Sequence, residues 1–491
     1  MIGGFRRGQI LCIGAASVGA VVIVNLTPTA GGFMSALLLV GVGVALAIVP
    51  ISGRTLEEWA PVLGAWLRAT ATGARRYRAA ASENGVTSSL DGSCARTPIE
   101  LPSCLAGCEI AAAATGDRDV GVLHDSSLSA LTVVVAVTAR AVGLLPTSEH
   151  EARLGRWGQV LASLARGGTP IRRLQILQRA LPADADGLWR HFLEARDPEV
   201  PLESQLELSY TSLLEQAQQV TQDHEILLAI QVDESRTLAR AGRDTRAGNL
   251  SKREQSHQAL LREVRTLLTR FEPVDVEIAG VLSAEQYAAA IRSAYDPFRR
   301  ADPYEGPERV PSSLSFGPTA ADTEWSIYRS EGAVHRTYWV AQWPRLAVGP
   351  LFMAPLLLGA DAVHSVSLVI EPIPAARSRR AVEAAITSDE ADEELRERRG
   401  FRTTARRRRQ QSAALDREEE LASGHEEVRF AGYVTVTART MGELDDACER
   451  VEHAAQQSYL ELVPLWGEQD SGFVHGALPL ARGLNASRAL L

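Results

Sequence analysis

The sequence has almost no lysine and few aromatic residues. Lys252 is the only lysine among 491 residues, and aromatic residues make up 5% of the chain. A P-loop needs a lysine after its glycine to reach the β- and γ-phosphates of a nucleotide, whereas Lys252 follows Ser251 in a polar run. The sequence therefore has no Walker A motif, and lysine-dependent chemistry such as a pyridoxal phosphate Schiff base would rest on this one residue.

The chain also lacks an excess of positive charge. Its formal net charge is −9 and charged residues make up 23% of it, which argues against a disordered polyelectrolyte and against a basic nucleic-acid coat. Hydrophobic residues account for 45% of the chain. A chain of this length is expected to form about three structural units with cores of their own.

Cysteine is scarce, and its spacing gives no convincing site. The chain has five cysteines, an odd number that does not indicate a disulfide framework. Cys104 and Cys108 lie four residues apart with Cys94 upstream, which suggests zinc, but no second ligand pair has a usual spacing. We interpret these residues as incidental loop thiols.

Catalytic motifs are missing as well. His224-Glu225 and His425-Glu426 are not followed by a histidine at the spacing of two zinc ligands on one helix face, and no G-x-S-x-G elbow occurs. We therefore predict no enzyme activity, no cofactor and no metal ion. A hydrolase that uses His124-Asp125 or His224 in a cleft is the alternative.

No charged residue occurs between Arg7 and Arg54. This stretch divides into two apolar runs, 9–26 and 33–51, each near the ~20 residues that a helix needs to cross a bilayer. A short loop with proline and glycine separates them. The pattern predicts a transmembrane helical hairpin over residues 1–53.

Arginines flank both predicted spans. Because Lys and Arg near the ends of spans stay on the cytoplasmic side, both chain ends and the body from Arg54 onward are expected to be cytoplasmic, below the inner membrane. A cleaved signal peptide is the alternative interpretation of the first span.

Residues 54–102 are predicted to form an amphipathic juxtamembrane helix followed by a linker rich in Ser, Gly and Asn. Trp59 and Trp66 lie on the apolar face of this helix. The two rings suit either the lipid headgroup level or packing against the body, and both residues are candidate interface positions.

Short β-prone segments alternate with helical segments in the following part, which predicts an α+β fold with a mixed α/β body. We expect an α/β domain over 103–235, with a central strand at 131–138, and an α/β region over 236–375. Residues 236–253 are predicted to be a flexible loop. The apolar run 346–358 is too short for a third span and is expected to be a buried or docking segment.

Charges of both signs crowd together in residues 376–427, which predicts a long charged helical insertion. Four successive arginines, Arg406 to Arg409, are able to contact phosphates. No aromatic residue interleaves with them for base stacking, so a solvated or partner-binding helix face is the preferred interpretation and direct nucleic-acid binding is not expected.

Residues 428–491 have the pattern of a βαβ unit. A strand is expected over 428–437, a helix over 441–457 and a second strand over 459–463. The region continues through Gln469 to a Leu-Pro-Leu sequence at Leu478, Pro479 and Leu480.

This region resembles the end of the amino-terminal domain of VirB-type conjugation ATPases, which has a G-Y-x-T-V-T strand, a helix and a Gln followed by L-P-L. The resemblance rests on these residues: Gly432, Tyr433, Thr435, Val436, Thr437, Glu468, Gln469, Leu478, Pro479, Leu480 and Gly483. Where that family continues into its P-loop domain, this sequence ends at Leu491. The predicted hairpin with Gly53 to Trp59 is similar to PrgI-type hairpins of Gram-positive type IV secretion systems. Together the two parts resemble an actinobacterial membrane protein family that joins them.

The resemblance implies a non-catalytic inner-membrane docking component of a conjugation or type IV secretion-like apparatus. A VirB-type ATPase and other channel subunits would be its partners, with membrane lipid at the hairpin, and copies of the chain would assemble in a ring. Gln469 and Leu478 to Leu480 are the candidate interface at the motor-facing end. An EccE-like component of a type VII secretion system is a second interpretation.

Overall fold

The computed structural model describes most of the chain. Its described residues are 7–48, 54, 56–79, 101–115, 118–139, 146–165, 169–182, 192–195, 204–205, 208–213, 222–241, 252–274, 276–298, 316–374, 377–380 and 427–484. The predicted charged insertion at 376–427 lies outside these residues except for 377–380 and Glu427, as does nearly all of the predicted linker after residue 79.

The chain forms two compact units. The first comprises Met1–Ala74 with Ile373–Glu427 and Leu490, and the second comprises Arg75–Pro372 with Val428–Ala489 and Leu491. The first unit contains α1 (Arg7–Leu26), α2 (Ala30–Ile48) and α3 (Leu56–Thr72).

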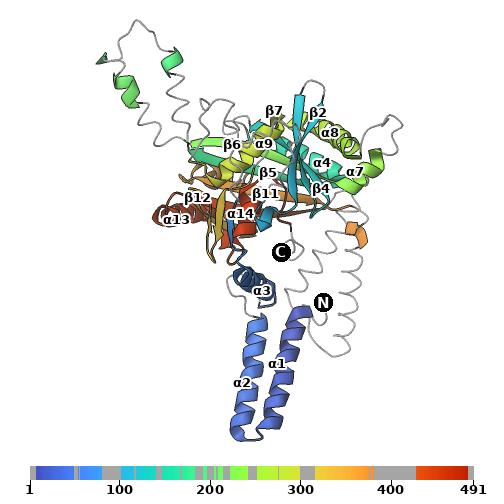
Figure 1. Cartoon of the computed structure of the whole chain (residues 1–491), viewed down its shortest axis with the longest axis vertical. Coiled ribbons are helices and arrows are strands. Elements are labelled where there is room, and N and C mark those ends of the chain that lie inside the picture. The colour runs from blue at the N-terminus through green and yellow to red at the C-terminus, as the bar shows by residue number, and fades with distance from the viewer. Residues whose placement is uncertain are drawn as a thin grey trace, which may run out of the picture. The chain divides into compact units, whose positions relative to one another are not determined.

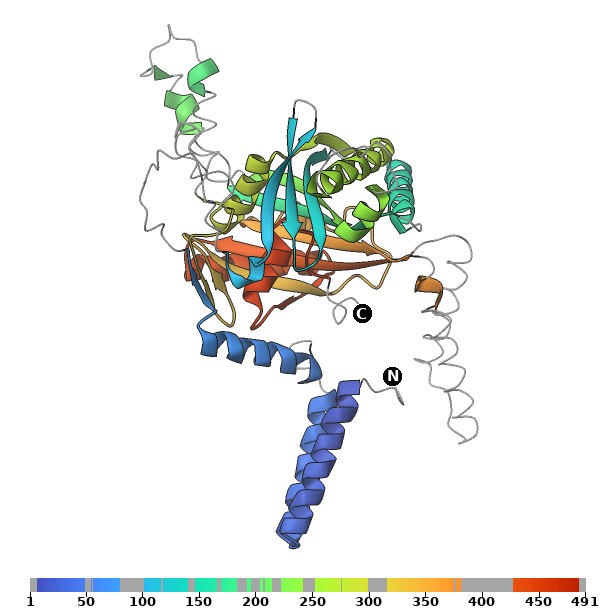
Figure 2. The ribbon, with the colours of Figure 1, turned by 45° about the vertical axis from the view of Figure 1, so that its right-hand side comes forward.

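Helices α1 and α2 lie side by side along their lengths (Figures 1 and 2). Small residues permit this close approach: a Cβ atom added at Gly43 would lie 2.5 Å from Cβ of Ala16. The sequence correctly predicted the positions of both helices and the short turn between them.

The prediction that these helices form a transmembrane hairpin is contradicted. Among the residues that the structure describes, which include the side chains of 16–26 and 30–44 in these two helices, no helix is both long enough and apolar enough to cross a membrane. The predicted inner-membrane location, with two spans and both chain ends cytoplasmic, is corrected on the same finding.

The second unit is built on one sheet of 13 strands. The strands are β1 (Arg76–Arg78), β2 (Cys108–Thr115), β3 (Arg118–Asp125), β4 (Ala130–Ala139), β5 (Ile171–Pro182), β6 (Gln222–Asp233), β7 (Val276–Val281), β8 (Ala320–Thr323), β9 (Tyr328–Arg329), β10 (Val334–Gln342), β11 (His364–Pro372), β12 (Val428–Ala438) and β13 (Glu461–Pro464). The order of pairing is β1-β8-β9-β10-β12-β11-β5-β6-β4-β3-β2, with β13 on β10 and β7 on β4.

The strand pairings described are all antiparallel, which corrects the predicted mixed α/β body with βαβ units. The predicted unit at 428–491 shows why. Its order of strand, helix and strand is present as β12, α13 (Met441–Gln457) and β13, but both strands pair with β10, which lies between them. A helical connection does not by itself say whether another strand separates the two that it joins.

Further helices in the described part of this unit include α4 (Thr147–Ala165), α7 (Glu234–Ala241), α8 (Lys252–Phe271), α9 (Ala284–Tyr295), α10 (Ala354–Leu358) and α14 (Gln469–Ala477). Short 3₁₀ turns lie at Ser103–Leu105 and Glu272–Val274. The predicted loop at 236–253 is helical at its start, where α7 reaches Ala241, and at its end, where α8 begins.

Helices cover both faces of the sheet, as Figure 2 shows. Helices α4 and α8 pack over β4, β5 and β6, and α10 and α13 pack on the same face over β10, β11 and β12. Helices α9 and α14 cover the opposite face. Strand β4 contacts both layers, with Val133 and Val135 in one core and Val134 in the other, which confirms the predicted central strand at 131–138.

Candidate functional site

The predicted motor-facing residues lie together in the core of the second unit. Gln469 is the first residue of α14, and Leu478, Pro479 and Leu480 directly follow this helix. All four are buried, with no exposed surface on Gln469, Leu478 or Leu480. We call residues 478–484 the C-terminal segment.

Gln469 fixes the start of α14 on the sheet. Its Oε1 accepts a hydrogen bond from the backbone N–H of Thr337 (2.8 Å), and its Nε2 donates to the carbonyls of Thr337 (3.3 Å) and Leu465 (3.1 Å). The side chain thus pairs with strand β10 as a neighbouring backbone would. In this structure the role of Gln469 is to seat the helix.

Three side chains from three elements hold the C-terminal segment. Gln175 of β5 donates to the carbonyl of Leu478 (3.0 Å), and Gln231 of β6 donates to that of Leu480 (3.3 Å). The hydroxyl of Tyr287 on α9 donates to the carbonyl between them, that of Pro479 (2.8 Å). Three successive carbonyls are thereby satisfied without a partner strand, as buried backbone groups require.

The same segment is held at two further points. The Oε1 atom of Gln175 accepts from the N–H of Ala481 (2.7 Å), so one side chain bonds the segment twice. At its end Arg173 donates to the carbonyl of Leu484 (3.0 Å) and also pairs with Glu371 (3.1 Å).

Burial raises the pKa of the Tyr287 hydroxyl well above its usual value, so this group stays a donor.

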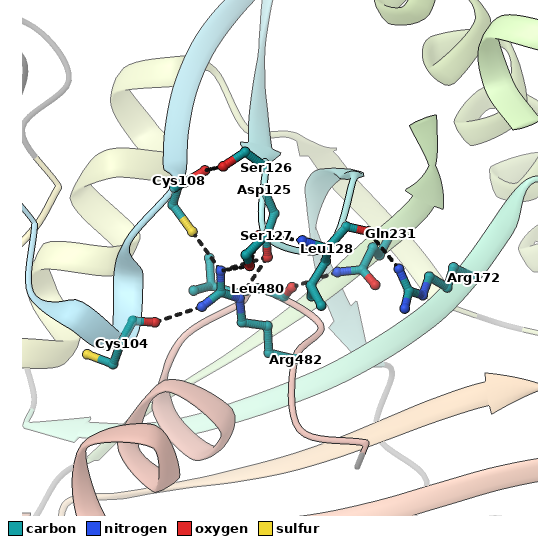
Figure 3. A network of polar contacts seen from close by, with 11 residues as sticks. Cys104, Cys108, Asp125, Ser126, Ser127, Leu128, Arg172, Gln231, Leu480 and Arg482 are labelled. Atoms are coloured by element: carbon teal, nitrogen blue, oxygen red, sulfur yellow. Dashed lines mark hydrogen bonds and ion pairs between the residues drawn. The ribbon is translucent and has the colours of Figure 1, made fainter. Parts of the chain in front are cut away.

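Arg482 ties the segment to the β3–β4 turn (Figure 3). Its Nε lies 2.7 Å from Oδ2 of Asp125, whose side chain is 1% exposed. Its Nη1 donates to the carbonyl of Cys104 (2.7 Å), and its Nη2 lies 3.1 Å from Sγ of Cys108. Oδ1 of Asp125 accepts from Ser127 (2.6 Å) and from the N–H of Leu128 (3.2 Å), so the carboxylate is satisfied on both oxygens.

The two cysteines at this cluster are unreactive in character. Burial raises the pKa of Cys104 well above its usual value and that of Cys108 to about 11, and the nearby Arg482 only partly opposes the effect. Thiols of this kind stay protonated at neutral pH and are poor nucleophiles and metal ligands. Within the described residues, no group of three or more His, Cys, Asp or Glu side chains is arranged to hold a metal ion.

The two predicted tryptophans lie in the first unit, on α3. Trp59 is 9% exposed, and the guanidinium carbon of Arg54 lies 5.4 Å from its ring centroid. Trp66 is half-buried. The structure therefore brings together four of the six predicted interface residues and places these two in the other unit.

The sequence did not identify the side chains that hold the C-terminal segment. Gln175 lies in the middle of β5 and Gln231 near the end of β6, each inside a largely apolar run, and both are fully buried. An uncharged polar residue within an apolar strand is the signal that marks such positions, because a buried amide needs partners. Asp125 and Arg482 gave no comparable signal, since 356 residues separate them in the sequence.

An open groove is the second notable feature of this unit. It has a volume of about 990 Å³ and is lined by the loop after β10 and by the end of α13. Its lining includes Gln342, Trp343, Leu346, Phe352, Tyr459 and Glu461. Leu346 is 83% exposed and Tyr459 69% exposed, so large apolar side chains border the groove.

Aromatic packing fixes Trp343, one of the side chains that line the groove. The rings of Trp343 and Phe430 meet edge to face, with centroids 5.2 Å apart. A Cβ atom at Gly432 would lie 2.7 Å from Cζ2 of Trp343, so the ring requires glycine at this position of β12. The groove is therefore a formed surface on the sheet, and its border carries the exposed side chains.

Comparison with known proteins adds no assignment to this geometry. No protein-family profile matches the chain, and no curated protein matches it either.

Proposed function

We propose that this chain is a non-catalytic docking component that holds a partner protein at the open groove beside Tyr459. The resemblance of residues 428–491 to the amino-terminal domain of VirB-type conjugation ATPases implies a conjugation or type IV secretion-like apparatus, with such an ATPase as the partner. The occupant of the groove would be a segment of that partner with apolar side chains, because the lining and its border are mainly apolar.

The backbone of Tyr459 is the observation that carries this proposal. Tyr459 follows α13 with φ +57°, in the left-handed region that glycine usually occupies after a helix. Its N–H donates to the carbonyl of Gln456 (3.0 Å), and the N–H of Leu460 donates to that of Ala455 (2.9 Å). A bulky residue in this conformation costs about 1 kcal/mol or more, and such costs gather at functional positions.

The exposure of the Tyr459 side chain is a second argument for a role in binding. The residue is 69% exposed, so the strained backbone does not serve to bury its side chain. Tyrosine and tryptophan commonly anchor protein interfaces, because each presents a large rigid surface with one polar end. Tyr459 and Leu346, together on the border of one groove, thus have the character of anchors for a partner.

The polar side chains on the opposite face of the sheet support the non-catalytic part of the proposal. Its buried glutamines hold the C-terminal segment, and Arg482 is bonded to Asp125. Side chains engaged in this way position backbone and are unavailable as acids, bases or nucleophiles. The proposed activity is therefore contact with a partner.

Photo-crosslinking in the native cells tests the proposal. The photoreactive residue p-benzoyl-phenylalanine is placed at position 346 of the full chain, or at 459, and crosslinked proteins are identified by mass spectrometry. We expect a VirB-type ATPase at both positions and no such product from position 449, where Glu449 is exposed on α13. Crosslinks to type VII secretion components alone would contradict the proposed partner.

The variant Tyr459→Gly separates binding from folding. Glycine relieves the left-handed strain, so stability should stay equal or rise by up to about 1 kcal/mol while capture of the partner falls. Unchanged capture by this variant and by Leu346→Ser would remove the groove as the docking site. Nucleotide hydrolysis above background by the purified full chain would overturn the non-catalytic assignment.

A further inference from the structure

Two histidines from distant parts of the chain face each other at the β2–β3 end of the sheet. His124 lies on β3 and His257 on α8, 133 residues apart, and their Nε2 atoms are separated by 2.6 Å. Their ring centroids are 4.9 Å apart with an interplanar angle of 57°. The pair lies outside the C-terminal segment and the groove.

The pair is flanked by charged groups of both signs. Glu109 lies directly opposite His124 in the β2–β3 register, and it forms an ion pair with Arg253 of α8 (3.0 Å). Arg253 lowers the pKa of His257, and Glu254 of α8 raises it. At both rings the charge of Arg253 has a larger effect on the pKa than the nearby carboxylate, so the case for a ligand at this pair rests on the geometry of the two imidazole nitrogens.

Both rings are neutral at physiological pH. Burial, with Arg253 as the next cause, lowers the pKa of His124 to about 4 and also lowers that of His257. Neutral imidazole is the form that binds metal ions. In the metal-free pair one Nε2–H donates to the other Nε2. With metal on both Nε2 atoms each ring carries its proton on Nδ1, so no net proton is released.

We propose that His124 and His257 form a two-histidine site for a divalent transition-metal ion that clips α8 to the β2–β3 hairpin. Imidazole nitrogen suits Zn²⁺, Ni²⁺ and Cu²⁺, whereas Mg²⁺ and Ca²⁺ prefer oxygen. Water completes the coordination shell. Glu109, whose side chain is 58% exposed, lies opposite His124 on the neighbouring strand β2.

The geometry requires only a small adjustment. Two nitrogens bound at ~2.0–2.1 Å with angles between octahedral and tetrahedral lie roughly 2.9–3.4 Å apart. The observed separation of 2.6 Å must therefore widen by some tenths of an ångström. A rotation of either ring provides this without a change in backbone, because the two rings come from separate elements.

The clip would act on the edge of the sheet. Strand β2 ends the order of paired strands, and α8 packs against it. A metal ion bound only by the folded chain stabilises that state by mass action. Occupancy would therefore make the attachment of this hairpin dependent on available metal, independently of the proposed docking function.

Metal titration of the full chain tests the site. In calorimetry after chelator treatment we expect one Zn²⁺ or Ni²⁺ per chain, no binding of Mg²⁺, and a higher unfolding temperature with Zn²⁺. In His124→Gln and in His257→Gln the affinity should fall at least about tenfold, since even changes outside the ligand shell cost that much. His453→Gln, a change on the exposed face of α13, should bind as the unchanged chain does.

Cu²⁺ provides a readout that does not depend on stability. The electron paramagnetic resonance spectrum of the Cu²⁺-loaded chain should show hyperfine coupling to two equivalent nitrogens, and one or none in the single variants. Coupling that persists in the double variant His124→Gln/His257→Gln, or equal Zn²⁺ affinity in that variant, would overturn the site. An absence of one-to-one binding by the unchanged chain would overturn it equally.

Discussion

Two seven-residue stretches of the second unit have nearly the same composition and opposite environments. The C-terminal segment (478–484) and the loop 345–351 each contain one Pro, one Ala, one Arg, one Gly and three aliphatic residues. Leu478 and Leu480 have no exposed surface, whereas Leu346 is 83% exposed. Apolar content alone therefore does not decide which stretch is buried.

The difference lies in the side chains that other strands direct at each stretch. The carbonyls of 478, 479 and 480 each accept a hydrogen bond from a buried side chain. Arg345 of the loop pairs with its neighbour Gln342 (2.7 Å), whereas Arg482 pairs with Asp125 across the sheet. An irregular apolar stretch is buried here because its backbone and its charge find partners.

The largest loss of stability is expected when Arg482 is replaced. Arg482→Met leaves the carboxylate of Asp125 buried without its cation, which is expected to lower the free energy of unfolding by about 3–5 kcal/mol. Urea titration measures the change. The double variant Asp125→Asn/Arg482→Met should lose less than the sum of the two single changes.

A surface pair provides the control for that experiment. Arg329 and Glu324 lie 2.7 Å apart with side chains 40% and 43% exposed. Arg329→Met should change the free energy of unfolding by about 1 kcal/mol or less. A loss in Arg329→Met equal to that in Arg482→Met would show that the cluster of Figure 3 does not hold the segment.

Gln175 allows the backbone contacts to be tested separately from charge. Gln175→Leu removes bonds to Leu478 and Ala481 and leaves a buried carbonyl and N–H unpaired, which should cost about 2–3 kcal/mol. Gln457→Leu, on the exposed end of α13, is expected to change stability little. Equal denaturation midpoints for these two variants would contradict the assigned role of Gln175.

Lowering the pH should weaken the packing of α14 on the sheet. Burial lowers the pKa of His335 to about 3, and its ring centroid lies 4.5 Å from that of Phe473 on α14. His335 Nε2 contacts Ser330 Oγ (2.7 Å), and Nδ1 contacts Thr437 Oγ1 (2.9 Å). The hydroxyl of Ser330 donates to the carbonyl of Tyr295, so the arrangement fits a neutral ring that donates from Nε2.

The sign of this effect follows from which state binds the proton. Below about pH 6.5 the unfolded chain takes up a proton at His335 that the folded chain does not, so stability falls with falling pH. Between pH 7 and pH 5 the residue should remove about 2 kcal/mol of unfolding free energy, a loss that continues toward pH 3. Urea titrations at both pH values measure it, and His335→Gln should show a correspondingly smaller dependence.

The smallest effect is expected in the loop. Leu346→Ala should change the free energy of unfolding by no more than about 0.5 kcal/mol, because the side chain is already in water. The same change at Leu480 serves as the buried counterpart in matched thermal unfolding experiments. A destabilised Leu346→Ala would show that the loop packs on the body in solution and is not an open border.

Local signals in the sequence predicted local structure well. The predicted helix 441–457 matches α13, and the three-residue spacing of Ser283 and Gln286 is that of the capping box they form at the start of α9. These patterns depend on residues three or four positions apart, so all the interacting groups lie within about one helical turn. The pairing of strands is different, because β10 precedes β12 by about 90 residues and no local pattern records that it separates β12 from β13.

The candidate site was likewise predicted only in part. The sequence drew attention to Gln469 and to Leu478 to Leu480, which the structure places together, but it predicted an outward role for residues that are buried. The groove was only partly foreseen, since a buried or docking segment was expected over 346–358. Which apolar stretch stays open depends on donors and acceptors supplied by distant strands, such as Gln231 of β6.

The position of β12 also bears on the order in which the chain assembles. This strand fills the place between β10 and β11, with pairings over Val334–Trp339 on one side and His364–Pro372 on the other. During synthesis both neighbours leave the ribosome long before it does. The place between β10 and β11 is therefore filled only after both neighbours have been made. Pairings between strands so far apart in the sequence predict slow folding, with a period in which the edges of β10 and β11 are exposed to incorrect pairing.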